Sequence, residues 1–476
     1  MSEILLPAKD LKPVLIGLGK VVSRKSTLPV LQQIRIAREG NNITIQATDL
    51  DTWATYRFSE QQGNKVEFYV PFETLNKIVK ALKGDALITL HQTKDAAKLV
   101  YEVGGSPVEV KLQGLGKDEW PQEPKVIGPD HLLPENFKSA LGEALECAGN
   151  SSRYVLNGAC LDVAGKGGHY VVGTNGSHLF ASNSFQFNLK ASVLIPTSKF
   201  IVWNGFAEDG DWHLITGKIK DAPWLKLTST HWQLVSKQID GNYPNWRQCV
   251  PVPNSKWTRL TLPQSEIESL LKNIPLLPGN DDLNRPVTLE VTADAVLLKG
   301  KAKDAKDWTS IRIAGTKVTG KPVEILLNRE YLLKAMRFGL LDVEIEGALS
   351  PMLFSATGKT LVVMPVNGRA PQNPQPAKPE VNKPAPSAEP RTEERKTDMP
   401  TQTISERGNL KPTQESNPYK EALDKVESVK GQLRVLLSEL NDLSSLLKQA
   451  EKEKRSSEKD VASVRQTIRS LQGLKI

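Results

Sequence analysis

Hydrophobic and polar positions follow the same order three times within the first 369 residues. In each repeat, a Leu-Pro pair precedes an amphipathic stretch with apolar residues three or four apart, which is typical of a helix covering a core. Alternating β-branched segments follow, and an apolar strand then leads into a second helix. The second helices are expected within FYVPFETLNKIVKAL, VLIPTSKFIVWNG and EILLNREYLLKAMRFG. The Leu-Pro pairs are Leu6–Pro7, Leu133–Pro134 and Leu262–Pro263.

The repeat predicts an α+β unit that is used three times, with a period of roughly 125 residues. We expect the three domains to span 1–125, 130–251 and 256–369. Because several strands separate the two helices of a repeat, both helices can lie on one face of a sheet. The other face is then left to the strands.

The pattern changes sharply near residue 370. Residues 370–418 are rich in proline and polar residues and nearly lack large apolar ones, which predicts a disordered linker. Residues 419–474 carry a heptad pattern that predicts a coiled-coil helix. One series comprises Val426, Leu433, Leu440, Leu447, Val461 and Ile468, and the other comprises Val429, Leu436, Leu443, Ala450, Val464 and Leu471.

The apolar seam of this helix fails at Lys454 and Ser457 but resumes in register at Val461. One long helix is therefore favoured over a helical hairpin that turns near 453–459. An apolar stripe must be buried against another helix, so the segment either associates with itself or binds an unknown partner protein. The sequence leaves both alternatives open.

Composition indicates a soluble globular protein with hydrophobic cores: 39% of residues are hydrophobic and 24% are charged. Cys147, Cys160 and Cys249 lie far apart, which argues against a disulfide framework or a zinc site and suits a cytoplasmic protein. Neither a signal peptide nor a membrane-spanning run is visible. The net charge of +8 favours a polyanionic partner, although an excess of this size is weak evidence alone.

Motifs for enzymatic chemistry are missing. The glycines of GKGGHY (165–170) lack phosphate-loop spacing, and the six histidines show no metal-binding spacing such as HExxH. Asp49 and Asp51 form a carboxylate pair without companions, which a turn explains better than catalysis. We therefore expect no catalytic residue, no metal site, no cofactor and no enzymatic activity.

Several local motifs, in order along the threefold repeat, resemble the bacterial DNA polymerase III beta subunit, the beta sliding clamp family. The first domain contributes TLPVLQQIRI (27–36) and ITIQATDLDTWATYRF (43–58). The second contributes RYVLNGACLDV (153–163), VVGTNGSHLFAS (171–182) and QIDGNYPNWRQCVP (238–251), and the third ends with SPMLFSA and LVVMPVNGR within 350–369. Each string alone is weak, but their shared order and spacing are specific.

The resemblance implies a homodimeric ring of six similar domains, with helices lining a central hole and sheets forming the rim. Such a ring encircles duplex DNA without reading its sequence and gives the polymerase processivity. Matching positions imply DNA contacts at Arg24, Lys25, Arg153 and Tyr154. Further DNA candidates, assigned to helices, are Lys12, Lys20, Lys77, Lys80, Lys138, Lys199 and Lys272; a solvated helix surface explains any one of them equally well.

The resemblance also implies a cleft that binds short peptides from DNA polymerases, the clamp loader and repair proteins. Its residues here would be Leu156, Thr174, Gly176, His178, Leu179, Pro244, Val362, Val363 and Met364. The alternative is that they are ordinary core residues buried between domains. The chain departs from the family at Asn175, Ser177, His178, Gln248 and Cys249, which puts its peptide preference in doubt. A specialised paralogue, or a scaffold that gathers proteins through its coiled coil, is the alternative function.

Overall fold

The computed structural model describes residues 2–92, 97–112, 119–150, 154–164, 168–282, 284–303 and 305–366. The chain divides into two compact units, Met1–Ala377 and Lys378–Ile476, and all described residues belong to the first. The predicted linker and coiled coil therefore lie outside the described residues, and both remain predictions. Within the described part of the chain, no helix is long and apolar enough to cross a membrane.

Leu-Pro pairs precede the first helix of each repeat, as predicted. Pro7 directly precedes α1, where a proline's missing N–H costs little because the first turn has no acceptor for it. Leu11, Val14 and Leu18 of α1 are buried at helical spacing. The α-helices among the described residues are α1 (Ala8–Leu18), α2 (Phe72–Ala81), α3 (Phe137–Cys147), α4 (Asn204–Ala207), α5 (Ile267–Asn273) and α6 (Arg329–Arg337).

The second helix of the middle repeat is much shorter than the sequence predicts. The strand Val193–Pro196 forms, but turns follow it, and α4 covers only Asn204–Ala207. Phe200, Ile201 and Phe206 of this segment are all buried in the core, so packing of these side chains outweighs the apolar spacing that favoured a longer helix. The expectation of a full helix in this segment was wrong.

An eight-stranded sheet joins the first repeat to the second, in the order β5-β2-β3-β4-β16-β15-β14-β9. Strand β4 pairs antiparallel with β16, so Trp53 lies opposite Val235, and the junction is a continuous hydrogen-bonded ladder. The strands are β2 (Gln33–Glu39), β3 (Asn42–Thr48), β4 (Thr52–Glu60), β5 (Val66–Pro71), β9 (Asp130–Leu132), β14 (His213–Ile219), β15 (Ala222–Thr228) and β16 (Trp232–Lys237).

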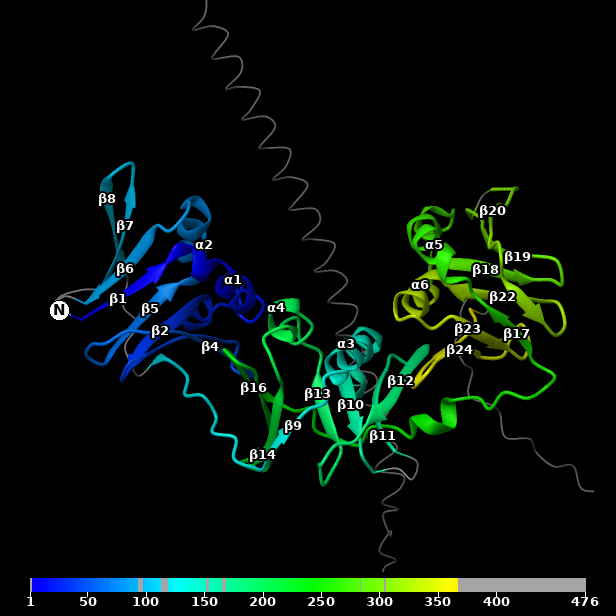
Figure 1. The fold of residues 1–476 in the computed structure, drawn as a ribbon, viewed down its shortest axis with the longest axis horizontal. Coiled ribbons are helices and arrows are strands. Elements are labelled where there is room, and N and C mark those ends of the chain that lie inside the picture. The colour runs from blue at the N-terminus through cyan, green and yellow to red at the C-terminus, as the bar shows by residue number, and fades with distance from the viewer. Residues whose placement is uncertain are drawn as a thin grey trace, which may run out of the picture. The chain divides into compact units, whose positions relative to one another are not determined.

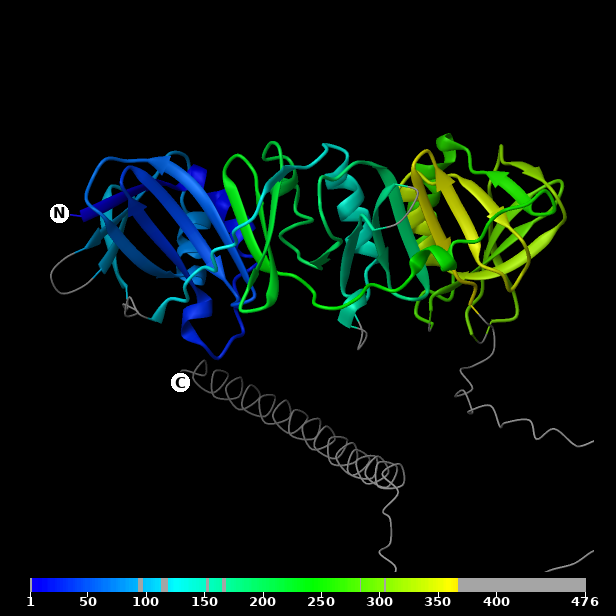
Figure 2. The ribbon, with the colours of Figure 1, turned by 90° about the horizontal axis from the view of Figure 1, so that it is seen from below.

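A nine-stranded sheet joins the second repeat to the third in the same way, in the order β13-β10-β11-β12-β25-β24-β23-β17-β21. Here β12 pairs antiparallel with β25. The strands are β10 (Gly158–Asp162), β11 (His169–Thr174), β12 (His178–Phe185), β13 (Val193–Pro196), β17 (Thr258–Thr261), β21 (Lys317–Thr319), β23 (Asp342–Ile345), β24 (Met352–Ala356) and β25 (Lys359–Val363). Both junctions can be followed in Figures 1 and 2.

Two four-stranded sheets complete the first and third repeats, in the orders β1-β6-β7-β8 and β20-β19-β18-β22. Strands β8 and β20 each stand at the end of their sheet and so present an open edge. The strands are β1 (Ser2–Pro7), β6 (Leu87–Gln92), β7 (Ala97–Val103), β8 (Ser106–Leu112), β18 (Pro286–Val291), β19 (Val296–Gly300), β20 (Thr309–Arg312) and β22 (Val323–Asn328).

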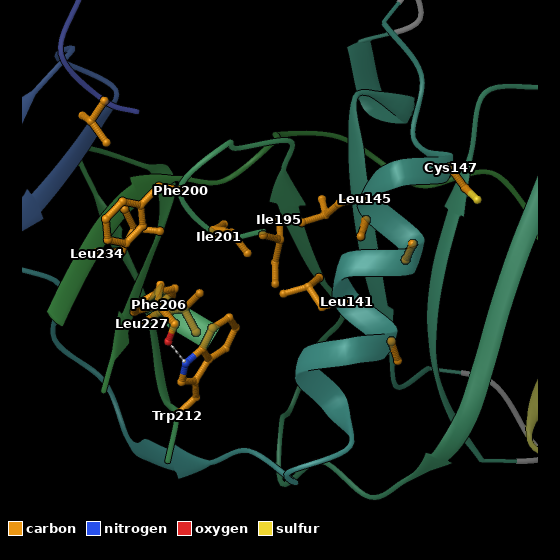
Figure 3. Close-up of a cluster of buried hydrophobic side chains, with 14 of the residues drawn as sticks. Leu141, Leu145, Cys147, Ile195, Phe200, Ile201, Phe206, Trp212, Leu227 and Leu234 are labelled. Atoms are coloured by element: carbon orange, nitrogen blue, oxygen red, sulfur yellow. Dashed lines mark hydrogen bonds between the residues drawn. The ribbon is translucent and has the colours of Figure 1, made fainter. Parts of the chain in front are cut away.

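The helices pack on the sheets through apolar faces. Figure 3 shows Leu141 and Leu145 of α3 pointing toward Ile195 of β13. In the same view, Trp212 Nε1 donates a 3.1 Å hydrogen bond to Phe206 O, which satisfies the indole of a buried tryptophan. On β11, a side chain at Gly173 would collide with the backbone of α3, because its Cβ would lie 1.8 Å from Ala144 O. The observed architecture is the predicted α+β fold.

Candidate functional site

The β12–β25 pair brings together residues that are far apart in the sequence. Leu179 lies opposite Val362, and both side chains face the same side of the nine-stranded sheet. They pack there in a buried cluster with Trp246, against which Tyr243 also packs. We call this side the front face. Met364 follows two positions after Val362, and its side chain is 43% exposed.

The turn between β11 and β12 is held by its own polar groups. Thr174 Oγ1 donates a 2.6 Å hydrogen bond to His178 O and accepts one of 3.1 Å from Gly176 N. Gly176 has φ +90°, a conformation that side chains rarely adopt. Met364 N donates a 2.9 Å hydrogen bond to Ser177 O, which connects the end of β25 to this turn.

His178 and Val363 lie opposite one another but face the other side of the sheet, which we call the back face. Side chains alternate along a strand, so neither can share a surface with Leu179 and Val362. Val363 is fully buried in the main core, and His178 is 3% exposed. Burial, reinforced by the ammonium of Lys334, lowers the pKa of His178 to about 3. These two predicted cleft residues therefore support the sheet from behind.

The remaining predicted cleft residues lie near the front face without forming one continuous lining. Leu156 is buried at the end of the short 3₁₀ helix Tyr154–Leu156, whose Val155 packs against the front-face cluster. Pro244 is exposed and lines a hollow of about 510 Å³ together with Tyr243 and Trp246. The structure thus brings Leu179, Val362 and Met364 together, with the others around them.

Trp246 and Arg247 separate this hollow from a second one of about 480 Å³. The Arg247 guanidinium carbon lies 4.5 Å from the Trp246 ring centroid, and Arg247 forms an ion pair with Asp162. Sequence reasoning did not assign a role to these residues. The aromatic residues of QIDGNYPNWRQCVP were the available signal, because an exposed turn seldom carries a tyrosine and a tryptophan without burying them.

Basic side chains are exposed on the helices of the first repeat. Lys12 on α1 and Lys77 and Lys80 on α2 are exposed, and Arg24 and Lys25 occupy the turn after α1. Arg24 pairs with Glu73 at 3.1 Å, with both side chains about half exposed, so solvent screens the pair and its net contribution is small. Lys272 on α5 and Tyr154 are exposed as well. Arg153 lies outside the described residues.

Two of the lysines assigned to helices lie in turns, and a third lies on its helix but is hydrogen-bonded to the protein's own backbone. Lys199 lies in a turn before α4, and Lys20 lies in the turn after α1 with its ammonium 5.8 Å from the Trp203 ring centroid. Lys138 is on α3, but its Nζ donates 2.9 Å to Ala207 O and also bonds Gly210 O. Its ammonium therefore serves the fold, and a free cation for DNA is not available there.

Among the described residues, no cluster of His, Cys, Asp and Glu has the arrangement of a metal site. Cys147 and Cys160 are buried and burial raises both thiol pKa values to about 12, whereas Cys249 is exposed. Asp49 accepts hydrogen bonds from Asp51 N and Thr52 N, so this carboxylate stabilises a turn. The expected absence of catalysis remains a prediction.

Comparison with known proteins covers the part of the chain that holds these sites. The family model of the DNA polymerase III beta subunit, N-terminal domain, matches residues 9–124. The beta sliding clamp of Synechococcus elongatus is 25% identical over 378 residues, which span 74% of this chain and 96% of the relative. The beta sliding clamp of Pseudomonas aeruginosa is 25% identical and is matched over 87% of its length.

Solved structures agree on the fold. The DNA polymerase III subunit beta from Pseudomonas aeruginosa matches with a TM-score of 0.64 at 20% identity, covering 77% of this chain and 100% of that one. The family model and the curated relatives both point to the beta sliding clamp family, and the solved structures share its fold. A sliding clamp from Bartonella birtlesii bound to griselimycin matches with a TM-score of 0.66 at 22% identity over 99% of its length. About a quarter of this chain has no counterpart in those relatives.

Proposed function

We propose that this protein is a DNA sliding clamp, a non-catalytic ring that encircles duplex DNA in the cytoplasm and tethers a DNA polymerase. The observation that carries the proposal is the match over 96% of the length of a beta sliding clamp, with every repeat present. A clamp retains DNA through its closed shape, so it needs no base contacts. Its attraction to DNA then depends on cations facing the phosphates.

The helix side of the first repeat supplies such cations. Lys12, Lys77 and Lys80 extend from α1 and α2, and Arg24 and Lys25 follow α1. Lys12 Nζ donates a 3.3 Å hydrogen bond to Leu82 O and Arg24 pairs with Glu73. The exposed Lys25, Lys77 and Lys80 are therefore the cations best suited to contact phosphates without fixed register. Tyr154 and Arg153 in the second repeat, and Lys272 in the third, are further contacts in this proposal.

Ring closure requires a junction between two copies, and the chain already contains two junctions of the required kind. Each joins edge strands of successive repeats, β4 with β16 and β12 with β25. The open edges β8 and β20 would form the third kind of junction, between copies. Trp308 immediately precedes β20 and is 51% exposed, so it offers an apolar anchor beside that edge.

The front face of the β12–β25 pair is the proposed binding site for partner peptides from the polymerase, the clamp loader and repair proteins. Met364 exposes an apolar side chain there, above the buried Leu179 and Val362, and methionine adapts to differently shaped partners. The aromatic residues Tyr243 and Trp246 border this surface.

Topological retention is the decisive test of the clamp function. The full-length protein would be loaded by a bacterial clamp loader onto nicked circular DNA, and bound protein would be separated from free protein by gel filtration at high salt. We expect retention on the circle and rapid loss once a restriction enzyme linearises it. Equal retention on circular and linear DNA would refute encirclement.

The cleft needs a separate test with a defined ligand. Griselimycin is bound to the sliding clamps from Bartonella birtlesii and Pseudomonas aeruginosa in solved structures, and we propose that it binds the front face here. Met364→Asp places a charge on this apolar surface and should weaken griselimycin binding at least tenfold, about 1.4 kcal/mol. Leu349→Asp, at a 78% exposed position in the third repeat, is the control and should bind normally.

A further inference from the structure

The back face of the β12–β25 pair is contacted by one side of α6. Tyr331, Lys334 and Arg337 are spaced three apart, so their side chains project from neighbouring positions on that helix. The Tyr331 ring stacks on His178, with ring centroids 4.0 Å apart and planes inclined by 21°. Asn175 Nδ2 donates 3.1 Å to the Tyr331 hydroxyl. The helix of the third repeat therefore holds the turn that precedes β12.

Lys334 connects three segments. Its Nζ donates 2.6 Å to Glu146 O at the end of α3 and lies 3.2 Å from His178 Nε2. Arg337 completes the contact through an ion pair with the Glu146 carboxylate. A lysine at a helix C-terminus satisfies a carbonyl that the helix itself leaves without a partner. Lys334 does this for α3 while also binding the imidazole.

The hydrogen bonds fix which nitrogen of His178 carries the proton. Asn175 Oδ1 accepts from Ser177 N and His178 N, so it is the oxygen of that amide. It lies 2.8 Å from His178 Nδ1, which must therefore donate to it. Nε2 is left as the acceptor for the Lys334 ammonium. The imidazole is neutral, and each of its nitrogens has a partner.

We propose that Lys334, with Tyr331 and Arg337, is a positioning residue of the peptide cleft, which it shapes from behind through His178. The inference rests on the proposed role of the front face in binding partner peptides. The turn that Lys334 and Tyr331 hold leads directly into Leu179, and Ser177 of the same turn is bonded to Met364 N. Movement of the turn would therefore shift two residues of the front face together.

The charges around His178 predict how the arrangement responds to pH. On α6, Lys334 and Tyr331 contact His178 directly. At the end of α3, Glu146 and Cys147 interact with Lys334. Burial and the Lys334 charge both oppose protonation of the imidazole. The wild-type cleft should therefore be insensitive to pH between about 5 and 8. Without the ammonium, Nε2 becomes free to bind a proton once the turn loosens.

The test compares Lys334→Met with Lys334→Arg in the full-length protein, using griselimycin titrations at pH 7.5 and 5.5. Methionine keeps the length of the side chain but removes the donor and the charge. We expect about tenfold weaker binding at pH 7.5, a further loss at pH 5.5 in Lys334→Met alone, and recovery in Lys334→Arg. Lys317→Met, at an exposed position of β21 in the same repeat, is the matched control and should match the wild type at both pH values.

Hydrogen exchange supplies a readout that needs no ligand. Backbone amides of residues 175–179 should exchange about tenfold faster in Lys334→Met, while exchange in the first repeat stays unchanged. Unchanged exchange in 175–179 overturns the proposal, as does unchanged griselimycin binding by Lys334→Met. A wild-type protein that escapes from circular DNA, or a Met364→Asp variant with normal griselimycin binding, would instead contradict the clamp or the cleft, and the exchange result would still decide the role of Lys334.

Discussion

Glu123 Oε1 accepts a 2.5 Å hydrogen bond from Gln233 Nε2, which joins the segment between the first two repeats to β16. Its Oε2 accepts from Gln46 Nε2 on β3 and from the Thr55 hydroxyl on β4. One partly buried carboxylate therefore ties the connecting segment to strands of both repeats.

Glu123→Ala should lower the free energy of unfolding by about 1–3 kcal/mol, because the partly buried Gln233 Nε2 and Thr55 hydroxyl lose this acceptor. Burial raises the pKa of Glu123 above its ordinary value of 4.5. As pH rises, the Glu123 carboxyl therefore loses its proton in the unfolded chain before it does so in the folded protein. The contribution of Glu123 to the free energy of unfolding is greatest below pH 4.5 and declines as pH rises through the folded pKa. Urea unfolding at several pH values should show the loss in Glu123→Ala shrinking over that window. A loss that is constant with pH would contradict this account.

Replacing Arg329 should destabilise the third repeat. The side chain is fully buried, and its guanidinium donates to five backbone carbonyls: those of Ile274, Leu277, Pro278, Arg285 and Pro286. Arg329→Met should cost about 3–5 kcal/mol, as breaking a buried charged network does. Arg329→Lys should retain only part of this stability, because an ammonium lacks the planar set of five N–H donors that a guanidinium presents. Thermal unfolding measures both variants, and a change below about 1 kcal/mol in Arg329→Met would contradict the prediction.

DNA binding should separate exposed lysines from internally bonded ones. Lys77→Gln should weaken binding to duplex DNA and reduce the slope of log affinity against log salt by about 1, as expected for one lost phosphate contact. Lys138→Gln is the control: it should leave the salt slope unchanged but lower stability by about 1–2 kcal/mol, because its ammonium bonds backbone carbonyls. Fluorescence anisotropy at three salt concentrations measures these slopes. Equal slopes of log affinity against log salt for Lys77→Gln and the wild type would show that Lys77 does not contact DNA.

Trp308→Ser should weaken association between copies by at least tenfold, about 1.4 kcal/mol, because truncating an interfacial tryptophan removes its buried area. Analytical ultracentrifugation measures the dimer dissociation constant. Ile127→Ser removes an 84% exposed apolar side chain from the segment between the first two repeats and should have no effect. If both variants dimerise like the wild type, β20 is not the junction.

Removal of residues 370–476 should leave a body that still dimerises and still holds circular DNA, since the three repeats lie before this point. Light scattering tests the two interpretations of the heptad segment. A full-length assembly larger than a dimer, absent after truncation, indicates self-association, and an unchanged mass favours a different partner protein. A truncated protein that cannot close on DNA would contradict the modular interpretation.

Local sequence signals were sufficient to predict elements whose conformation depends mainly on neighbouring residues. Leu6–Pro7 before α1 and Leu133–Pro134 before α3 mark helices through proline geometry and apolar spacing, which need no tertiary information. The short α4 shows the limit of that reasoning. Ile201 and Val202 fit the apolar spacing of a helix, but the chain turns here to bury Phe200 and Ile201, and only Asn204–Ala207 is helical.

Candidate sites were harder to predict, because a residue type does not say where its side chain will point. Lys138 resembles its exposed neighbours in sequence, yet carbonyls from a later segment bind its ammonium. The back-face position of His178 was accessible in principle, since it must oppose Leu179 by strand alternation. The burial of Arg329 could not be foreseen, because the carbonyls around it come from segments 43 to 55 residues away along the chain.

The two ladders at β4–β16 and β12–β25 also govern how the molecule comes apart. Releasing one repeat strips backbone partners from the next, so the three should melt in a single transition. Fragments cut at the boundaries between repeats would expose unpaired strands along their flanks and tend to aggregate. The stability of each repeat therefore depends on that of its neighbours.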